Sequence, residues 1–118
     1  MKSGFCFLIL VVLVSCSDNS DKITACTINN PLEELGWLKE IKTGFEQSVY
    51  LSKKKIIHFT YQKKSVFLVD ICNDCADNLT TVYNCSGTII CEFGGIAGVN
   101  TCPDFDKNAT NKIILWEN

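Results

Sequence analysis

The chain has 118 residues, eight of them cysteines, and a formal net charge of −2. Its length corresponds to one domain of modest size, because domains commonly contain about 100–150 residues. All of its basic residues are lysines. Because proteins commonly use the arginine guanidinium for two-pronged hydrogen bonds to phosphates and base edges, the lack of arginine argues against a nucleic-acid partner.

The N-terminal segment reads as an export signal. An apolar run over residues 5–14 is shorter than the roughly 20 residues that a membrane-spanning helix needs, and it has the length of a signal-peptide core. Leu13-Val14-Ser15-Cys16, which close the run, are typical of a bacterial lipobox. We therefore predict a lipoprotein signal peptide over residues 1–15, with an ordinary secretory leader as the alternative.

Lipidation of Cys16 would anchor the chain without spanning the membrane. Each buried methylene contributes about 0.8 kcal/mol, and one chain alone binds only marginally, so two or more acyl chains such as palmitate are expected. A polar tether over residues 16–25 then leads to a single domain over residues 26–118. The expected location is the bacterial cell envelope, on the outer membrane, facing the periplasm or the cell surface.

Six cysteines remain in the predicted mature domain. They are Cys26, Cys72, Cys75, Cys85, Cys91 and Cys102. An even set of cysteines in a short exported chain indicates a disulfide framework. We expect three disulfides, but six cysteines allow fifteen connectivities and the spacing does not choose among them.

The first predicted element of the domain is a helix. Asn30-Pro31 is a typical helix start, because asparagine can cap free amide groups and proline fits the first turn. Apolar residues then recur at helical spacing and predict one apolar stripe. The stripe consists of Leu35, Leu38, Ile41, Phe45 and Val49.

Strand patterns follow the helix. The predicted strands are Lys55–Tyr61, Ser65–Cys72, Leu79–Asn84 and Thr88–Phe93, with Ile113–Trp116 as the candidate fifth. Gln62-Lys63-Lys64 is a hairpin turn in this interpretation, and Gly87 supplies the positive φ of a second turn. The predicted fold class is α+β, with one N-terminal helix packed on a disulfide-stapled antiparallel meander of four to five strands.

Several segments together resemble a known group of sequences. They are Asn30-Pro31-Leu32-Glu33-Glu34-Leu35 with Trp37-Leu38, Val66-Phe67-Leu68-Val69 with Cys72-x-x-Cys75, Val82-Tyr83-x-Cys85-x-Gly87, Ile90-Cys91-Glu92-Phe93-Gly94-Gly95 and Cys102-Pro103-Asp104-Phe105. Over roughly residues 26–118 the chain resembles an uncharacterised family of small Bacteroidetes-type lipoproteins. The resemblance implies a shared fold and an envelope location. It supplies no known activity and no catalytic residues that could be transferred to this chain.

The cysteine spacing leaves two chemical alternatives to structural disulfides. Cys72-Asn73-Asp74-Cys75 has the spacing of a redox motif, but such a pair normally opens a helix, and no helical pattern follows it here. A zinc site would combine Cys72 and Cys75 with Cys85 and Cys91, a set that lacks a second Cys-x-x-Cys. We therefore predict no metal and no cofactor.

Three other features are candidate sites. Gly94, Gly95 and Gly98 lie in a glycine-rich segment that is neither a P-loop nor a dinucleotide fingerprint, so it predicts a bend, with these glycines as the candidate ligand-binding residues. The segment from Asp104 begins like a calcium loop but lacks the required glycine and glutamate. His58, the only histidine, is expected to be exposed or hydrogen-bonded on its strand.

These observations predict a function class without a substrate. We expect a lipid-anchored envelope protein that acts as a non-catalytic binding or interaction module, with the membrane, a small ligand or an envelope protein as partners. We predict no catalytic residue. One alternative is a thiol redox protein that uses Cys72 and Cys75. Another is a stress-protective or structural lipoprotein with no specific ligand.

Overall fold

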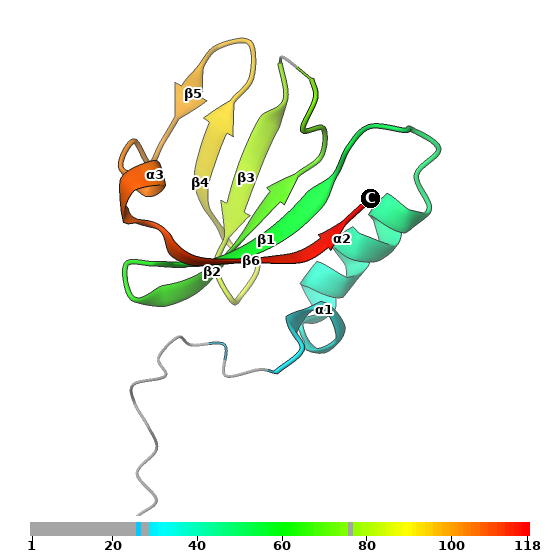
Figure 1. Cartoon of the computed structure of the whole chain (residues 1–118), viewed down its shortest axis with the longest axis horizontal. Helices are drawn as coiled ribbons and strands as arrows, with labels where there is room; N and C mark the ends of the chain where they lie inside the picture. The colour runs from blue at the N-terminus through cyan, green and yellow to red at the C-terminus, as the bar shows by residue number, and fades with distance from the viewer. Residues whose placement is uncertain (1–25, 27–28, 76) are drawn as a thin grey trace, which may run out of the picture.

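The structure, a computed structural model, describes residue 26, residues 29–75 and residues 77–118 (Figure 1). The predicted signal peptide, Cys16 and the tether lie outside the described residues. The elements in chain order are α1 (Pro31–Glu34), α2 (Gly36–Glu46), β1 (Lys55–Tyr61), β2 (Lys64–Asp70), β3 (Leu79–Tyr83), β4 (Ile89–Gly94), β5 (Val99–Asn100), α3 (Phe105–Asn108) and β6 (Thr110–Glu117).

The six strands form one antiparallel sheet with the order β5-β4-β3-β2-β1-β6. Strands β1 to β5 follow one another as a meander, and β6 then returns across the sheet to pair with β1 at the opposite edge. The meander is confirmed, but the prediction of four to five strands was too low. Strand β5 has two residues, which is too short for a hydrophobic period to be visible.

The predicted single helix is interrupted at Leu35. This residue is extended, with φ −91° and ψ 104°, and separates the single turn of α1 from the eleven-residue α2. The break allows Leu32, Leu35 and Trp37 to pack against the same cluster, although a continuous helix would point Trp37 away from the other two. Val49 lies beyond α2 and is 84 % exposed, so it does not extend the apolar stripe.

Helices cover both faces of the sheet. The helix-side cluster, built on Leu38, Ile56, Phe67 and Val69, packs beneath α1 and α2. The α3-side cluster on the other face is built on Tyr61, Val66, Val82, Cys91 and Phe105. The packing of the N-terminal helical region on one face is confirmed, and the cover provided by α3 on the second face was not predicted.

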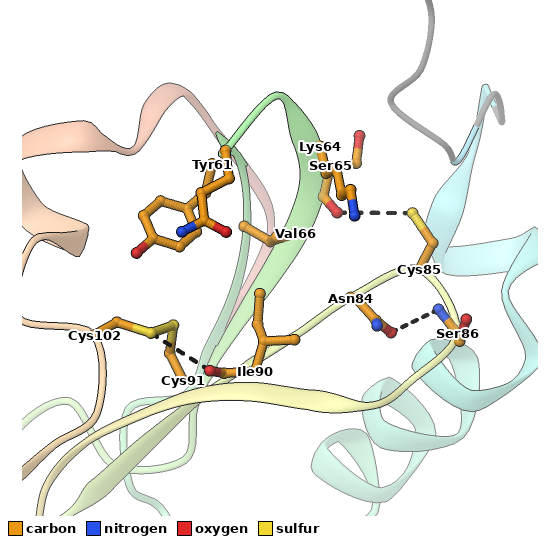
Figure 2. A pocket seen from close by; sticks show the side chains of 11 residues that line it. Tyr61, Lys64, Ser65, Val66, Asn84, Cys85, Ser86, Ile90, Cys91 and Cys102 are labelled. Atoms are coloured by element: carbon orange, nitrogen blue, oxygen red, sulfur yellow. Dashed lines mark hydrogen bonds between the residues drawn. A yellow bond between two sulfur atoms is a disulfide. The ribbon is translucent and has the colours of Figure 1, made fainter.

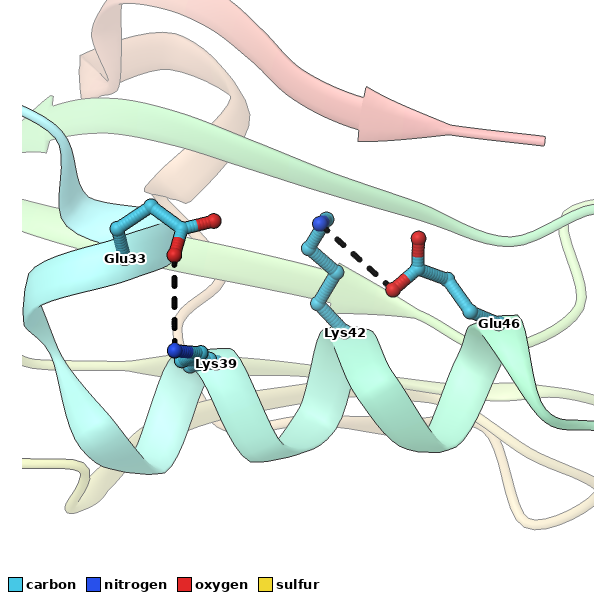
Figure 3. A network of polar contacts seen from close by, with 4 residues as sticks. All are labelled: Glu33, Lys39, Lys42 and Glu46. Carbon is cyan, nitrogen blue, oxygen red and sulfur yellow. Dashed lines mark ion pairs between the residues drawn. The ribbon is translucent and has the colours of Figure 1, made fainter.

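The outer surface of the helical region is polar. Lys39 lies 3.6 Å from Glu33, and Lys42 lies 3.6 Å from Glu46, one turn further along α2 (Figure 3). Exposed ion pairs of this kind contribute at most about 1 kcal/mol, so apolar burial on the opposite face holds the helix on the sheet.

Three disulfides staple the fold, as the even set of six cysteines predicted. They join Cys26 to Cys85, Cys72 to Cys75, and Cys91 to Cys102, with Cα–Cα distances of 5.7, 5.3 and 5.6 Å. The first ties the beginning of the described chain to the β3–β4 turn, and the last ties β4 to the segment before α3. The structure thus selects one of the fifteen possible connectivities.

The hairpin turns sort into two ends of the sheet. The β1–β2 turn and the β3–β4 turn lie at the end nearest α1, and the β4–β5 turn lies at the other end (Figure 1). Gln62 and Lys63 form a two-residue β1–β2 loop with φ values of 54° and 66°. This left-handed conformation suits the twist of a tight hairpin, although glycine or asparagine usually supplies it.

Candidate functional site

The glycine candidates lie in the exposed β4–β5 turn. Gly94, Gly95 and Gly98 have φ values of 97°, 77° and 67°, which L side chains rarely adopt. A Cβ built on Gly94 would lie 2.5 Å from the backbone oxygen of Asn78, and the amide of Gly95 donates to the same oxygen at 3.0 Å. Turn geometry and close packing therefore explain these glycines, and their role in ligand binding stays a prediction.

A cavity of about 410 Å³ opens at the opposite end of the sheet. One side of this end pocket comes from the β1–β2 hairpin and consists of Tyr61, Gln62, Lys64, Ser65 and Val66. The other side comes from the β3–β4 hairpin and the following segment, and consists of Asn84, Cys85, Ser86, Ile90, Cys91 and Cys102. Ligand pockets commonly enclose about 300–1,000 Å³, so the end pocket has a suitable size.

Two disulfides fix the side of the end pocket that comes from the β3–β4 hairpin and the following segment (Figure 2). Cys91 and Cys102 are bonded to each other at one edge of this side, and Cys85 is bonded to Cys26 at the other edge. The Cys85 Sγ atom also lies 3.7 Å from the backbone oxygen of Ser65 across the pocket. Because two disulfides hold the β3–β4 side and strand pairing holds the β1–β2 side, the pocket is preformed.

Trp37 supports the side of the pocket formed by the β3–β4 turn. Its indole Nε1 donates a hydrogen bond of 3.0 Å to the backbone oxygen of Cys85. A Cβ built on Gly87 would lie 2.9 Å from the indole ring, so this turn needs glycine both for its φ of 84° and for the close approach of Trp37. The predicted positive φ at Gly87 is confirmed.

Tyr61 forms a polar contact beside the end pocket. Its hydroxyl donates to Asp104 Oδ1 at 2.7 Å, and this bond raises the pKa of Tyr61. The same bond, together with one from Asn108, lowers the pKa of Asp104. Asp104 therefore accepts hydrogen bonds that connect α3 to β1. These bonds give a structural role to the first aspartate of the segment that resembled a calcium loop.

His58 lies on β1 and contacts Ser65, a residue of the pocket lining, without lining the end pocket itself. Its Nε2 atom is 3.0 Å from Ser65 Oγ, and its Nδ1 atom is buried with no hydrogen-bond partner among the described residues. Burial lowers the pKa of His58 below its ordinary value of 6.5, because the imidazolium form loses solvation. The structure therefore agrees with the prediction of a hydrogen-bonded histidine on this strand.

Acidification is expected to destabilise the fold through His58. Because the pKa is lower in the folded state, the unfolded chain binds more protons, so the free energy of unfolding decreases as pH falls below about 6.5 toward the folded-state pKa. Above that window the His58 contribution is constant. Urea unfolding at several pH values between about 5 and 8 should show this slope in the wild type and a flatter one in His58→Gln. Equal slopes in the two proteins would contradict the assignment.

The Cys-x-x-Cys pair lies at the end of the sheet away from the pocket. Cys72 is buried and Cys75 is exposed, and their sulfur atoms lie within 4.8 Å of a carboxylate oxygen of Asp74. No helix begins at this pair in the described chain. The four-cysteine zinc hypothesis was wrong, because Cys85 and Cys91 belong to two other disulfides.

The end pocket was not predicted from the sequence. Gln62, Lys64, Asn84 and Ser86 have the composition of ordinary turns, and only the strand order brings them together. The predicted meander could have indicated that the two turns lie close together, because in consecutive antiparallel hairpins the first and third turns fall at the same end of the sheet.

Comparison with other proteins identifies the family and gives no function. Among the described residues, no helix combines the length and the apolar character needed to cross a membrane. No curated protein and no solved structure matches the chain. A family model covers residues 42–118, which include all six strands, α3, and the C-terminal part of α2. The chain therefore belongs to the family described as Domain of unknown function (DUF6970).

Proposed function

We propose that this protein is a lipid-anchored, non-catalytic binding module of the bacterial cell envelope and that it takes a small molecule into the end pocket. The observation that carries the binding role is the preformed cavity of about 410 Å³ between the two hairpins. The lipobox over residues 13–16 supports the anchor, and the three disulfides support an oxidising compartment.

The polar groups nearest the pocket favour binding over catalysis. The imidazole of His58 is hydrogen-bonded to Ser65, and the phenol of Tyr61 is hydrogen-bonded to Asp104. The three cysteines in the wall are disulfide-bonded, so none offers a thiolate. These contacts hold the strands together, and they leave the pocket as a rigid receptor.

The alternative function is thiol redox chemistry at the Cys72–Cys75 disulfide, which is partly exposed. Asp74 argues against it, because a carboxylate close to the two sulfur atoms disfavours a thiolate there. If the redox function holds, mild reductant should open this bond while the other two disulfides remain closed. Simultaneous reduction of all three bonds would eliminate the alternative.

The anchor is tested by replacing Cys16. In its native host, Cys16→Ala should abolish incorporation of labelled palmitate, whereas Cys6→Ala, within the predicted leader, should leave incorporation unchanged. Labelling of the Cys16→Ala protein would overturn the lipid anchor.

The binding role is tested with the neutral apolar dye N-phenyl-1-naphthylamine. All described elements lie within residues 26–118, so the polypeptide 16–118, produced without acyl chains, contains every described helix and strand. We expect saturable binding of one dye, weakened about tenfold by Ile90→Asp because a charge then lies in the apolar wall. Ile89→Asp is the control, since Ile89 is also exposed but does not line the pocket. Equal binding by both variants and the wild type would refute the pocket as the site.

A further inference from the structure

We infer that the end pocket selects an anionic amphiphile, a small molecule with an apolar body and one acidic group such as a carboxylate. This inference rests on the proposed binding function and adds the chemical class of the ligand. It is carried by the distribution of charge, hydrogen-bond donors and apolar surface around the cavity.

The first observation is the charge of the lining. Lys64 is the one lining residue with a charged side chain, and no aspartate or glutamate lines the cavity. The ion pairs found among the described residues involve α1 and α2, so Lys64 has no carboxylate partner there. The one charge on the lining is therefore positive, while the carboxylate of Asp104 is held beside the pocket by the hydroxyl of Tyr61.

The second observation is that the acceptors of Asn84 are occupied while its side-chain donor remains open. The side-chain oxygen of Asn84 accepts from the amides of Ser86 at 2.9 Å and Thr88 at 3.0 Å, which leaves its Nδ2 group as a donor. The backbone oxygen of Asn84 accepts from the amide of Gly87. At Asn84, an incoming group that supplies acceptors therefore fits better than one that supplies donors.

The third observation is the apolar surface between the polar groups. Val66 and Ile90 come from opposite sides of the pocket, and in Figure 2 the Ile90 side chain extends toward Val66. The ring of Tyr61 closes the same region. An aliphatic or aromatic body would bury these surfaces, and small-molecule sites typically combine such an apolar lining with a few orienting polar groups.

These three features describe one ligand class. An apolar body on Val66 and Ile90 would place its acidic group beside Lys64 and the Asn84 amide, which come from opposite hairpins. A hydrogen bond between charged groups is roughly twice as strong as a neutral one, so the acid should add affinity over a neutral ligand of the same length.

The experiment compares octanoate, octan-1-ol and octylammonium as competitors of N-phenyl-1-naphthylamine on the polypeptide 16–118. We expect octanoate to displace the dye at about tenfold lower concentration than octan-1-ol, and octylammonium to be the weakest. Lys64→Gln should bring octanoate to parity with octan-1-ol. Lys63→Gln is the matched control, because the neighbouring Lys63 does not line the pocket, and it should preserve the preference.

The outcomes separate this inference from the proposed function. If the dye binds but octanoate and octan-1-ol compete equally in the wild type, the ligand class is wrong and the binding function stands. A preference for octanoate that Lys63→Gln removes as strongly as Lys64→Gln would reduce the effect to general surface charge and overturn the inference. If the dye does not bind at all, the proposed function fails first.

Discussion

Replacing Cys26 and Cys85 together by serine is expected to lower the free energy of unfolding by about 4 kcal/mol. The disulfide closes a sequence separation of 59 residues, so its loss returns much conformational freedom to the unfolded chain. Urea unfolding of the oxidised proteins measures the difference. The bond also holds the β3–β4 turn, so the same variant should lose affinity for a ligand of the end pocket.

The matched control is the double replacement of Cys72 and Cys75. That disulfide spans a separation of only three residues, so its loss should cost about 2 kcal/mol or less. If the short disulfide proved to stabilise the fold as much as the long one, chain entropy would not be the main contribution of these bonds.

The second large effect is expected for Phe105→Ala, which should cost about 4 kcal/mol of unfolding free energy. Phe105 is 3 % exposed, and its ring centroid lies 5.3, 4.9 and 5.3 Å from those of Phe59, Tyr61 and Phe93. Truncation would leave a cavity in the centre of the α3-side cluster. Thermal or urea unfolding of the variant measures the loss.

Asp106→Ala in the same single-turn helix is the control for this prediction. Asp106 is exposed and should tolerate truncation within about 0.5 kcal/mol. A loss of less than about 1 kcal/mol for Phe105→Ala would mean that the second face of the sheet has no core of its own.

Elements with a clear period were predictable from the sequence. The bounds of β1 agree with the prediction, and the opposition of His58 to Tyr61 on that strand follows from simple alternation. The predicted turn glycine, Gly87, has the expected positive φ. In each case the interactions that decide the conformation are local, so the pattern is visible in a few consecutive residues.

Features that depend on tertiary packing were not predictable in the same way. The helix breaks at Leu35, directly before the poor helix former Gly36, and Leu35 and Trp37 both pack against the helix-side cluster. Phe105 forms the centre of the α3-side cluster from a four-residue helix that shows no period. The disulfide pairing likewise depends on distances between strands and turns.

The end pocket illustrates the same limit at the level of function. The β2–β3 register pairs Phe67 with Tyr83. When this pairing is continued toward the end pocket, Ser65 lies opposite Cys85. Until that register is known, Lys64 and Asn84 are ordinary polar residues of two separate turns. The glycine-rich segment was predicted as the ligand-binding candidate because its composition is distinctive. It lies at the end of the sheet opposite the pocket, and the turn geometry explains its glycines.

Amide NMR of the oxidised polypeptide 16–118, titrated with octanoate, tests the central claim most directly. We predict that the largest chemical-shift changes occur at the amides of Lys64, Ser65, Ser86 and Ile90, which line the end pocket. Changes centred on residues 94–98, or no saturable changes at all, would contradict the assignment of this pocket as the binding site.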